Sequence, residues 1–276
     1  MPKTTIAIDL GGTHVRAARI TNGIIEQTIK EKCNATGSEN EVLQQLCKLI
    51  DAVINKDVER IGVGVPSVVD YSRGIVYDVQ NIPSWKEVHL KSYLEAHYHL
   101  PVIIDNDVNC FVLGEKIYGA GKQFNNVVGI TLGTGVGAGI ICNGQVYRGT
   151  NTGAGEIGCL PYLDSDYEHY CSSQWMKRQG FDAEQQSLLA SRGDEKALAS
   201  WREFGTHLGK LMQAILFTYD PDAIIIGGGI AAGATYFMES MKQSMHHGFP
   251  YQHEANNVKI LLSQLTDCNL LGAAEL

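Results

Sequence analysis

The sequence has no hydrophobic run that approaches the roughly 18 residues of a membrane-spanning helix. Its first residues, MPKTTIAIDL, lack the long apolar segment of a signal peptide. The seven cysteines are odd in number and scattered, with no CxxC pair, which argues against a disulfide framework. We therefore expect a cytoplasmic protein with reduced thiols and no membrane partner.

Positive charge is also scarce, because 30 Asp and Glu outnumber 22 Lys and Arg and give a formal net charge of −8. Binding of nucleic acid needs a basic surface, so we expect no nucleic-acid partner. The chain also lacks the Gly-Lys-Ser/Thr of a Walker loop and the spaced glycines of a dinucleotide fingerprint. The chain has 276 residues, of which 44% are hydrophobic, and this length and composition indicate one or two globular domains.

Two segments of the chain resemble each other: IAIDLGGTHVRAARITNG (6–23) and VGITLGTGVGAGIICNG (128–144). Each begins with a short apolar strand, turns through Leu-Gly and small residues, continues as a second strand and reaches Asn-Gly, a strong hairpin signal. A repeat offset by about half the chain predicts a duplicated domain.

Strand patterns alternate with helix patterns along the chain, which indicates an α/β fold. The halves are expected to separate near 119–122. The expected helices cover 39–56, 89–99, 108–118, 194–219 (as one or two helices) and 236–247, and the expected strands after the first repeat include 60–66, 102–104, 221–230 and 258–265.

Three glycine-rich turns follow strands: DLGGT (9–13), LGTGVGAG (132–139) and GGG (227–229). Backbone N–H groups in such turns can cradle phosphate oxygens without a lysine. A single turn of this kind would suit an ordinary hairpin equally well. Three of them at three strand ends favour a phosphate-binding site.

Polar residues crowd the end of the strand in VIIDNDVNC (102–110). Asp or Asn before a helix is a good N-cap, but one cap needs only one such residue. We interpret the cluster as both a helix N-cap and part of a catalytic site. Asp105 and Asn109 are expected to be structural, and Asn106 and Asp107 functional.

Two further loops carry candidate ligands of a polar substrate. Glu156 lies in the glycine-rich TGAGEIG (152–158), where an ordinary surface turn is the alternative. Asn81 opens NIPSW (81–85), where the alternative is a loop anchored by the packed Trp85. An amide beside an aromatic ring also suits the mixed faces of a sugar.

In order and spacing these motifs resemble those of the ROK sugar kinases (repressor, open reading frame, kinase). The likeness runs from Ile6 to Gly158 and resumes at DPDAIIIGGGI (220–230) and LLGAA (270–274). It implies a two-lobed actin/hexokinase-like ATPase fold, with a ribonuclease H-like core in each lobe and the active site in the cleft. The N-terminal, sugar-side lobe would be 1–118, joined by the C-terminal helix 266–276. The nucleotide-side lobe, which would also dimerise, would be 119–265.

The resemblance also implies roles for particular residues. Asp107 is the expected catalytic base, and Asn81, Asn106, Asp107 and Glu156 the expected sugar contacts. Asp9 is expected to position Mg²⁺ through water. Asp9 and two phosphate loops would bind the nucleotide phosphates. The first loop contains Gly11, Gly12 and Thr13, and the second contains Gly133, Thr134 and Gly135. A third stretch, Gly227, Gly228 and Gly229, would border the nucleotide.

The sequence departs from the family pattern where most members carry a zinc segment. Cys159 replaces the usual His after Gly-Glu-Ile-Gly, and only His169 and Cys171 remain as possible ligands. Three such residues are too few for a closed structural zinc site, so we expect no zinc. The sugar-binding Glu that ends this segment in the family has no clear counterpart here, with Ser173 as the candidate for its place, and this leaves the choice of hexose open.

The sequence therefore predicts an ATP-dependent, Mg²⁺-using hexose kinase that acts at C6 and forms a homodimer. Glucose leads the candidate sugars, followed by fructose, mannose, allose and N-acetylhexosamines. The alternatives are a sugar-sensing regulator and a sugar-binding protein without catalysis. Regulators of the family carry a DNA-binding helix-turn-helix first, for which we expect no room before Asp9, and the retained Asp107 and phosphate loops speak against lost catalysis.

Overall fold

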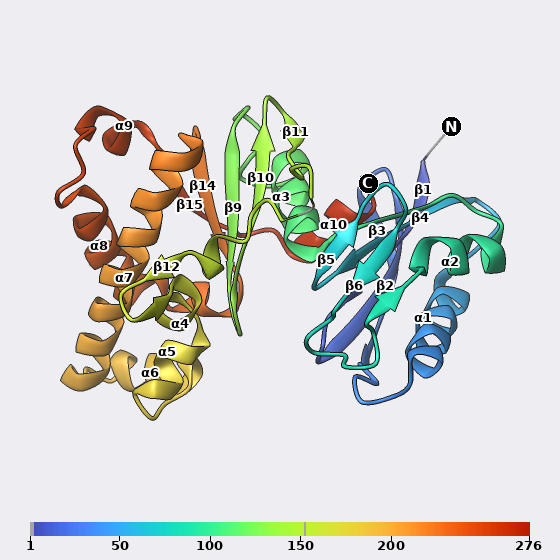
Figure 1. Ribbon diagram of the computed structural model, residues 1–276, viewed down its shortest axis with the longest axis horizontal. Helices are drawn as coiled ribbons and strands as arrows, with labels where there is room; N and C mark the ends of the chain where they lie inside the picture. Colours follow the sequence, from blue (N-terminus) through green and yellow to red (C-terminus); the bar gives the residue numbers. More distant parts are fainter. Residues whose placement is uncertain (1–2, 152) are drawn as a thin grey trace. The chain divides into compact units, whose positions relative to one another are not determined.

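The computed structural model describes residues 3–151 and 153–276, and the chain divides into two compact units. The first unit combines three stretches of sequence, Met1–Lys122, Val146–Ala154 and Gln264–Leu276, and the second combines Gln123–Gln145 and Gly155–Ser263. Each unit has its own hydrophobic core and its own five-stranded sheet (Figure 1). The α/β class predicted from the sequence is confirmed.

The sheet of the first unit has the strand order β3-β2-β1-β4-β8. Its first three strands are antiparallel, whereas β1, β4 and β8 run parallel. The central strand is buried on both faces, since Ile6, Ala7 and Ile8 have no exposed surface, and this explains its continuous apolar sequence. The strands are β1 (Thr4–Leu10), β2 (His14–Thr21), β3 (Ile24–Lys32), β4 (Val58–Val65) and β8 (Val102–Asn106).

Helices cover both faces of this sheet. Helix α1 packs with Ile6 and Ile8 on one face, while α3 and α10 pack with Ala7 and Ala18 on the other. Helix α1 begins with a capping box, in which Ser38 and Glu41 exchange hydrogen bonds. The helices are α1 (Glu39–Val53), α2 (Leu90–Tyr98), α3 (Asp107–Ile117) and α10 (Cys268–Ala273), and a small second sheet contains β5 (Val68–Asp70), β6 (Ile75–Tyr77) and β7 (Glu87–Val88).

The sheet of the second unit repeats this arrangement. Its order is β11-β10-β9-β14-β15, again with an antiparallel hairpin followed by parallel strands. The duplication predicted from the two similar segments is therefore confirmed: β1 and β2 of the first unit correspond to β9 and β10 of the second. The strands are β9 (Val127–Leu132), β10 (Val136–Cys142), β11 (Gln145–Val146), β14 (Ala223–Gly227) and β15 (Lys259–Leu262).

Two long helices pack closely in the second unit. Glycines on α7 face the backbone of α8: a Cβ at Gly205 would lie 2.4 Å from the Phe237 carbonyl, and one at Gly209 would lie 2.4 Å from the Met241 carbonyl. Longer side chains would force the helices apart. The helices are α4 (Tyr167–Cys171), α5 (Ser173–Arg178), α6 (Ala183–Ser191), α7 (Glu195–Tyr219), α8 (Ala234–His246) and α9 (Gln252–Asn257), with 3₁₀ turns η1 (Ile157–Cys159) and η2 (Gly229–Gly233) and a short pair β12 (Pro161–Tyr162) and β13 (Ser165–Asp166).

The five helices expected from the helix pattern all form, and 194–219 is one helix rather than two. The C-terminal helix that the resemblance implies forms as α10. The sequence did not indicate α4, α5, α6 and α9, which are short helices of five to nine residues. Such short helices present too few turns for a clear apolar period. Within the described parts of the chain, no helix is both long and apolar enough to cross a membrane.

Candidate functional site

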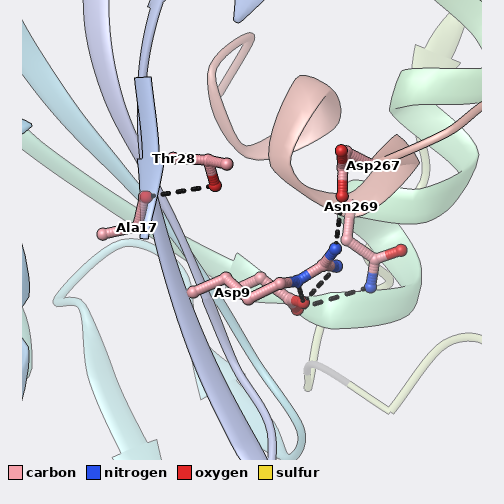
Figure 2. A network of polar contacts seen from close by, with 6 residues as sticks. Asp9, Ala17, Thr28, Asp267 and Asn269 are labelled. Carbon is pink, nitrogen blue, oxygen red and sulfur yellow. Dashed lines mark hydrogen bonds and ion pairs between the residues drawn. The ribbon is translucent and has the colours of Figure 1, made fainter. Parts of the chain in front are cut away.

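The carboxylate of Asp9 lies at the end of β1 in a network of polar contacts (Figure 2). Arg16, its register partner on β2, donates to Asp9 Oδ2 from Nε at 3.0 Å and from Nη2 at 2.6 Å. The same guanidinium donates from Nη1 to Asp267 at 2.6 Å, and the Asn269 amide lies 3.5 Å from Asp9 Oδ1. Arg16 thus occupies one oxygen of Asp9, and within residues 3–151 and 153–276 the other has only the long contact with the Asn269 amide.

This arrangement fits a magnesium ion held through water. Mg²⁺ in nucleotide sites binds one or two carboxylates, substrate phosphates and several waters, and it needs no protein cage. Asp9 can offer Oδ1 to such a hydrated ion. Among the residues that the structure describes, no group of three or more His, Cys, Asp or Glu could hold a metal by itself.

The first glycine turn brings another expected residue, Asn81, next to the end of β1. A Cβ at Gly12 would lie 2.3 Å from the Asn81 Cβ, so only glycine fits there. The side chain of Asn81 is exposed. Its loop closes on itself through backbone hydrogen bonds between Val79 and Trp85, and Trp85 is fully buried. Trp85 is therefore the anchor of this loop and not a platform for a sugar.

The cluster of acidic and amide residues at 105–109 lies at the corner between β8 and α3. Asn106 is the N-cap of α3. The side-chain oxygen of Asn106 accepts from the backbone N–H groups of Val108 at 2.8 Å and Asn109 at 3.3 Å, and Nδ2 donates to the Ser67 carbonyl at 3.2 Å. Its oxygen is thereby occupied, and one N–H of Nδ2 remains for a ligand. Asn106 therefore caps α3, a structural role that we did not expect for it.

Asp105 is buried beneath this corner and is 2% exposed. It accepts hydrogen bonds from Arg148 Nε at 2.7 Å, Asn109 Nδ2 at 2.8 Å and the backbone N–H of Asn106 at 2.8 Å. Structural roles for Asp105 and Asn109 agree with the expectation. Arg148 was not identified from the sequence, because nothing in YRGTN marks a partner 43 residues away.

Asp107 is the first residue of α3, where the helix dipole favours a negative charge. Burial raises the pKa of the Cys110 thiol on the next turn well above its ordinary value, and nearby carboxylates raise it further. Those carboxylates belong to Asp105, Asp107 and Asp9. The acidic residues at the ends of two parallel strands, β1 and β8, thus surround one buried position.

The second and third glycine turns meet at one edge of the other sheet. Gly228 follows β14 with φ +86°, and a Cβ there would lie 2.3 Å from the carbonyl of Leu132, the last residue of β9. A side chain at Gly228 would be both strained and blocked. Gly133–Gly135 and Gly227–Gly229 therefore lie together at the carboxyl ends of parallel strands, a usual place for ligands in α/β sheets.

Short helices after β13 hold the second glycine turn. The backbone N–H of Ser173 donates to the Gly133 carbonyl at 2.8 Å, and Glu168 Oε2 accepts from the backbone N–H of Val136 at 3.2 Å. A Cβ at Gly135 would lie 2.4 Å from the Glu168 carboxylate. Glu168 was not among the expected site residues.

Glu156 precedes the 3₁₀ turn η1 and reaches the protein surface. Nevertheless, desolvation by surrounding atoms raises its pKa above the ordinary value, and the negative charge of Glu168 raises it further. An acidic pair of this kind has one carboxyl that is easier to protonate than usual.

The residues that replace the family's zinc segment differ from one another in environment. Cys159 is exposed, Cys171 is fully buried, and His169 Nδ1 lies 2.7 Å from Asp166. A hollow of about 390 Å³ in the second unit is lined by Asp222, the residue before β14, and by Lys259, the first residue of β15. It is therefore at the end of the sheet opposite to the glycine turns.

Comparison with known proteins supplies relatives. The ROK family model matches residues 5–276. The glucokinase of Thermotoga maritima is 27% identical, with 100% of this chain and 98% of that protein aligned. The crystal structure of a ROK family glucokinase from Streptomyces griseus, in complex with glucose and AMPPNP, aligns with a TM-score of 0.84 and 27% identity over 99% of this chain and 98% of that one. The xylose repressor of Bacillus subtilis is 28% identical over 74% of this chain and 57% of its own length.

Proposed function

The chain belongs to the ROK family and is an ATP-dependent sugar kinase of the actin/hexokinase-like fold, and we propose that it transfers the γ-phosphoryl group of ATP to the C6 hydroxyl of a hexose. The observation that carries this proposal is the β8–α3 corner. There a carboxylate stands at a helix start beside an amide that still has a hydrogen to donate.

In the proposed mechanism Asp107 is the general base. Phosphoryl transfer depends mainly on positioning and charge stabilisation, because the sugar hydroxyl is a weak nucleophile. The Asp107 carboxylate holds the hydroxyl in line and takes its proton as the bond to phosphorus forms. Asp107 stands in the first turn of α3, where the helix dipole interacts favourably with a negative charge.

Nucleotide binding is assigned to the three glycine turns and Asp9. Backbone N–H groups of Gly11–Thr13 and Gly133–Gly135 would cradle phosphate oxygens, and Gly227–Gly229 would border the nucleotide. Asp9 would hold Mg²⁺ through water, with Arg16 on Oδ2 fixing the direction of the other oxygen, Oδ1. When bound, the ion neutralises charge on the transferred phosphate.

Sugar binding is assigned to Asn81, Asn106 and Glu156. The exposed amide of Asn81 can donate and accept, the remaining N–H of Asn106 can donate, and ionised Glu156 accepts from hydroxyls. The T. maritima and S. griseus relatives put glucose first among the substrates to try. Fructose, mannose, allose and N-acetylhexosamines follow.

Release of ADP with a panel of hexoses tests this function. We expect Mg²⁺-dependent turnover on at least one hexose, and ³¹P and ¹³C NMR of the product should place the phosphate on C6. Absence of turnover with every sugar would contradict the kinase, and a phosphate on another carbon would contradict the C6 assignment.

A sugar-sensing regulator is the second candidate function, favoured by the similarity to the xylose repressor. A regulator would bind its sugar without releasing ADP, so the same panel separates the two. We also propose that the first unit is the sugar side, that the second unit binds the nucleotide and forms a homodimer, and that the enzyme works in the cytoplasm.

A further inference from the structure

Arg148 forms an ion pair with Asp105, which lies two residues before the proposed base, Asp107, in the sequence. The Asp105 side chain is 3% exposed, and Arg148 Nε lies 2.7 Å from its Oδ2. A carboxylate so far from water is costly unless a cation and hydrogen-bond donors compensate for the lost hydration. Arg148 supplies that cation, and Asn109 adds a donor at 2.8 Å.

The guanidinium of Arg148 is fixed from a second direction by an aromatic ring. Its central carbon lies 3.9 Å from the centroid of Tyr71, a cation–π contact. The edge of the Arg148 guanidinium therefore contacts the Asp105 carboxylate, and its face contacts the Tyr71 ring. A planar guanidinium can make both contacts at once. Lysine could reproduce the charge but not the stacking.

Arg148 also belongs to an unusual stretch of chain. Val146–Ala154 packs with the first unit, although the residues on both sides of it belong to the second. The ion pair and the ring contact are thus tertiary anchors of this stretch on the first unit, and both lie next to the β8–α3 corner.

Asp105 transmits this anchoring to the residues of the proposed reaction. One of its oxygens, Oδ1, accepts from the backbone N–H of Asn106, which caps α3, and from the side chain of Asn109 in the first turn. The orientation of Asp105 thereby sets where α3 starts and where Asp107 projects. Misplacement of a reacting group by about 1 Å can cost about 100-fold in rate.

We propose that Arg148 is a positioning residue for the phosphoryl transfer, which acts by clamping Asp105 so that the β8–α3 corner holds Asp107 and Asn106 in reactive geometry. The inference rests on the proposed kinase function and extends it to Arg148 and Tyr71, which form no part of the expected sugar or nucleotide sites.

The test compares Arg148→Gln with Arg148→Lys and with the double variant Asp105→Asn/Arg148→Gln. Kinetics are measured well below each melting temperature, so that only folded enzyme is compared. For Arg148→Gln we expect kcat on the best hexose to fall by about 10- to 100-fold. The KM for ATP should stay within about twofold, because the pair belongs to the first unit and the second and third glycine turns belong to the second.

Rescue separates positioning from general stability. Arg148→Lys keeps a cation and should lose less kcat than Arg148→Gln. The double variant can pair two neutral amides and should recover part of the rate that Arg148→Gln loses, since no buried charge is left alone. Arg73→Gln is the matched control: it breaks another Arg Nε–Asp contact of the first unit, at 2.5 Å, but this arginine is 65% exposed. Its kinetic constants should be unchanged.

Arg148→Gln with a lower melting temperature but unchanged kcat and KM for sugar would overturn the inference and leave the pair purely structural. An equal rise of the KM for ATP and for sugar, or a double variant no faster than Arg148→Gln, would overturn it as well. A wild-type chain that turns over no hexose contradicts the proposed function instead. Sugar affinity of the same variants, measured by calorimetry without ATP, then decides whether the pair positions the sugar site.

Discussion

Neighbouring residues at the β8–α3 corner have different tasks, and a single substitution separates them. Asp107→Asn keeps the size of the side chain and removes the proposed base. We expect kcat to fall by about 10²- to 10⁴-fold, the usual worth of a general base, while sugar affinity stays within several-fold of wild type. Single-turnover kinetics and calorimetric sugar titration measure the two quantities. Near-normal kcat in this variant would sink the proposed mechanism.

Glu156 gives a second prediction for single residues. Its pKa lies above the ordinary value because of desolvation and then Glu168. Since only the ionised carboxylate is a pure acceptor, the KM for sugar should rise as the pH falls toward this pKa. Glu168→Gln removes one of the two causes and should move the rise to lower pH. Steady-state kinetics across the pH range where the protein stays folded provide the measurement.

The control for this pH dependence is Glu156→Gln, which cannot titrate. It should have a higher KM for sugar at neutral pH, and this KM should not vary as wild type does. A wild-type KM for sugar that is constant with pH, or a Glu168→Gln profile that coincides with wild type, would contradict the assignment of Glu156 as a sugar ligand.

The sequence located this cluster but did not identify Asn106 as the residue that caps α3. Which residue caps α3 depends on where β8 ends. If β8 ended one residue earlier, Asp105 and not Asn106 would be the N-cap. The charge of Asp105 depends on Arg148, whose approach follows from tertiary folding and not from local pattern. Trp85 illustrates the same limit, because burial rather than residue type decides between anchor and ligand platform.

At the level of helices and strands, the repeated sheets were predictable because each central strand is an apolar run closed by glycines. Helices α4, α5 and α6 were not, although Ser173 at the start of α5 and Glu168 in α4 hold the second glycine turn. Their positions depend on contacts with that turn, which a local pattern does not record. The local sequence pattern thus predicts the two repeated sheets better than the short helices that contact the second glycine turn.

The contact between α7 and α8 allows a prediction about elements. Gly205→Ala would gain about 1 kcal/mol from helix propensity. However, a Cβ would lie 2.1 Å from Ser240 Oγ and 2.4 Å from the Phe237 carbonyl, and overpacking typically costs about 1–3 kcal/mol. We expect a net loss of stability, measured by urea unfolding. Gly205→Ala/Ser240→Ala should recover part of it, because the nearer obstacle is removed. An increase in stability for Gly205→Ala alone would contradict the packing.

For the whole molecule, we expect folding without zinc. Cys159 is exposed, and His169 has Asp166 as a partner, so these positions have other surroundings than a closed metal site. Elemental analysis of purified protein should give zinc well below one ion per chain, and EDTA should leave the melting temperature unchanged. Stoichiometric zinc that resists dialysis would overturn this expectation.

Helix α10 has a consequence for biosynthesis. Its Gly272 lies against α3 so closely that a Cβ would come within 1.7 Å of the Cys110 carbonyl, and Arg60 donates to the Ala274 carbonyl at 2.5 Å. A ribosome makes Gln264–Leu276 only after the entire second unit. The first unit is therefore begun first and completed last. Until α10 emerges, the apolar surface around Ala7, Ala18 and Ile20 lacks its cover, and exposed apolar surface makes an incomplete chain prone to aggregation.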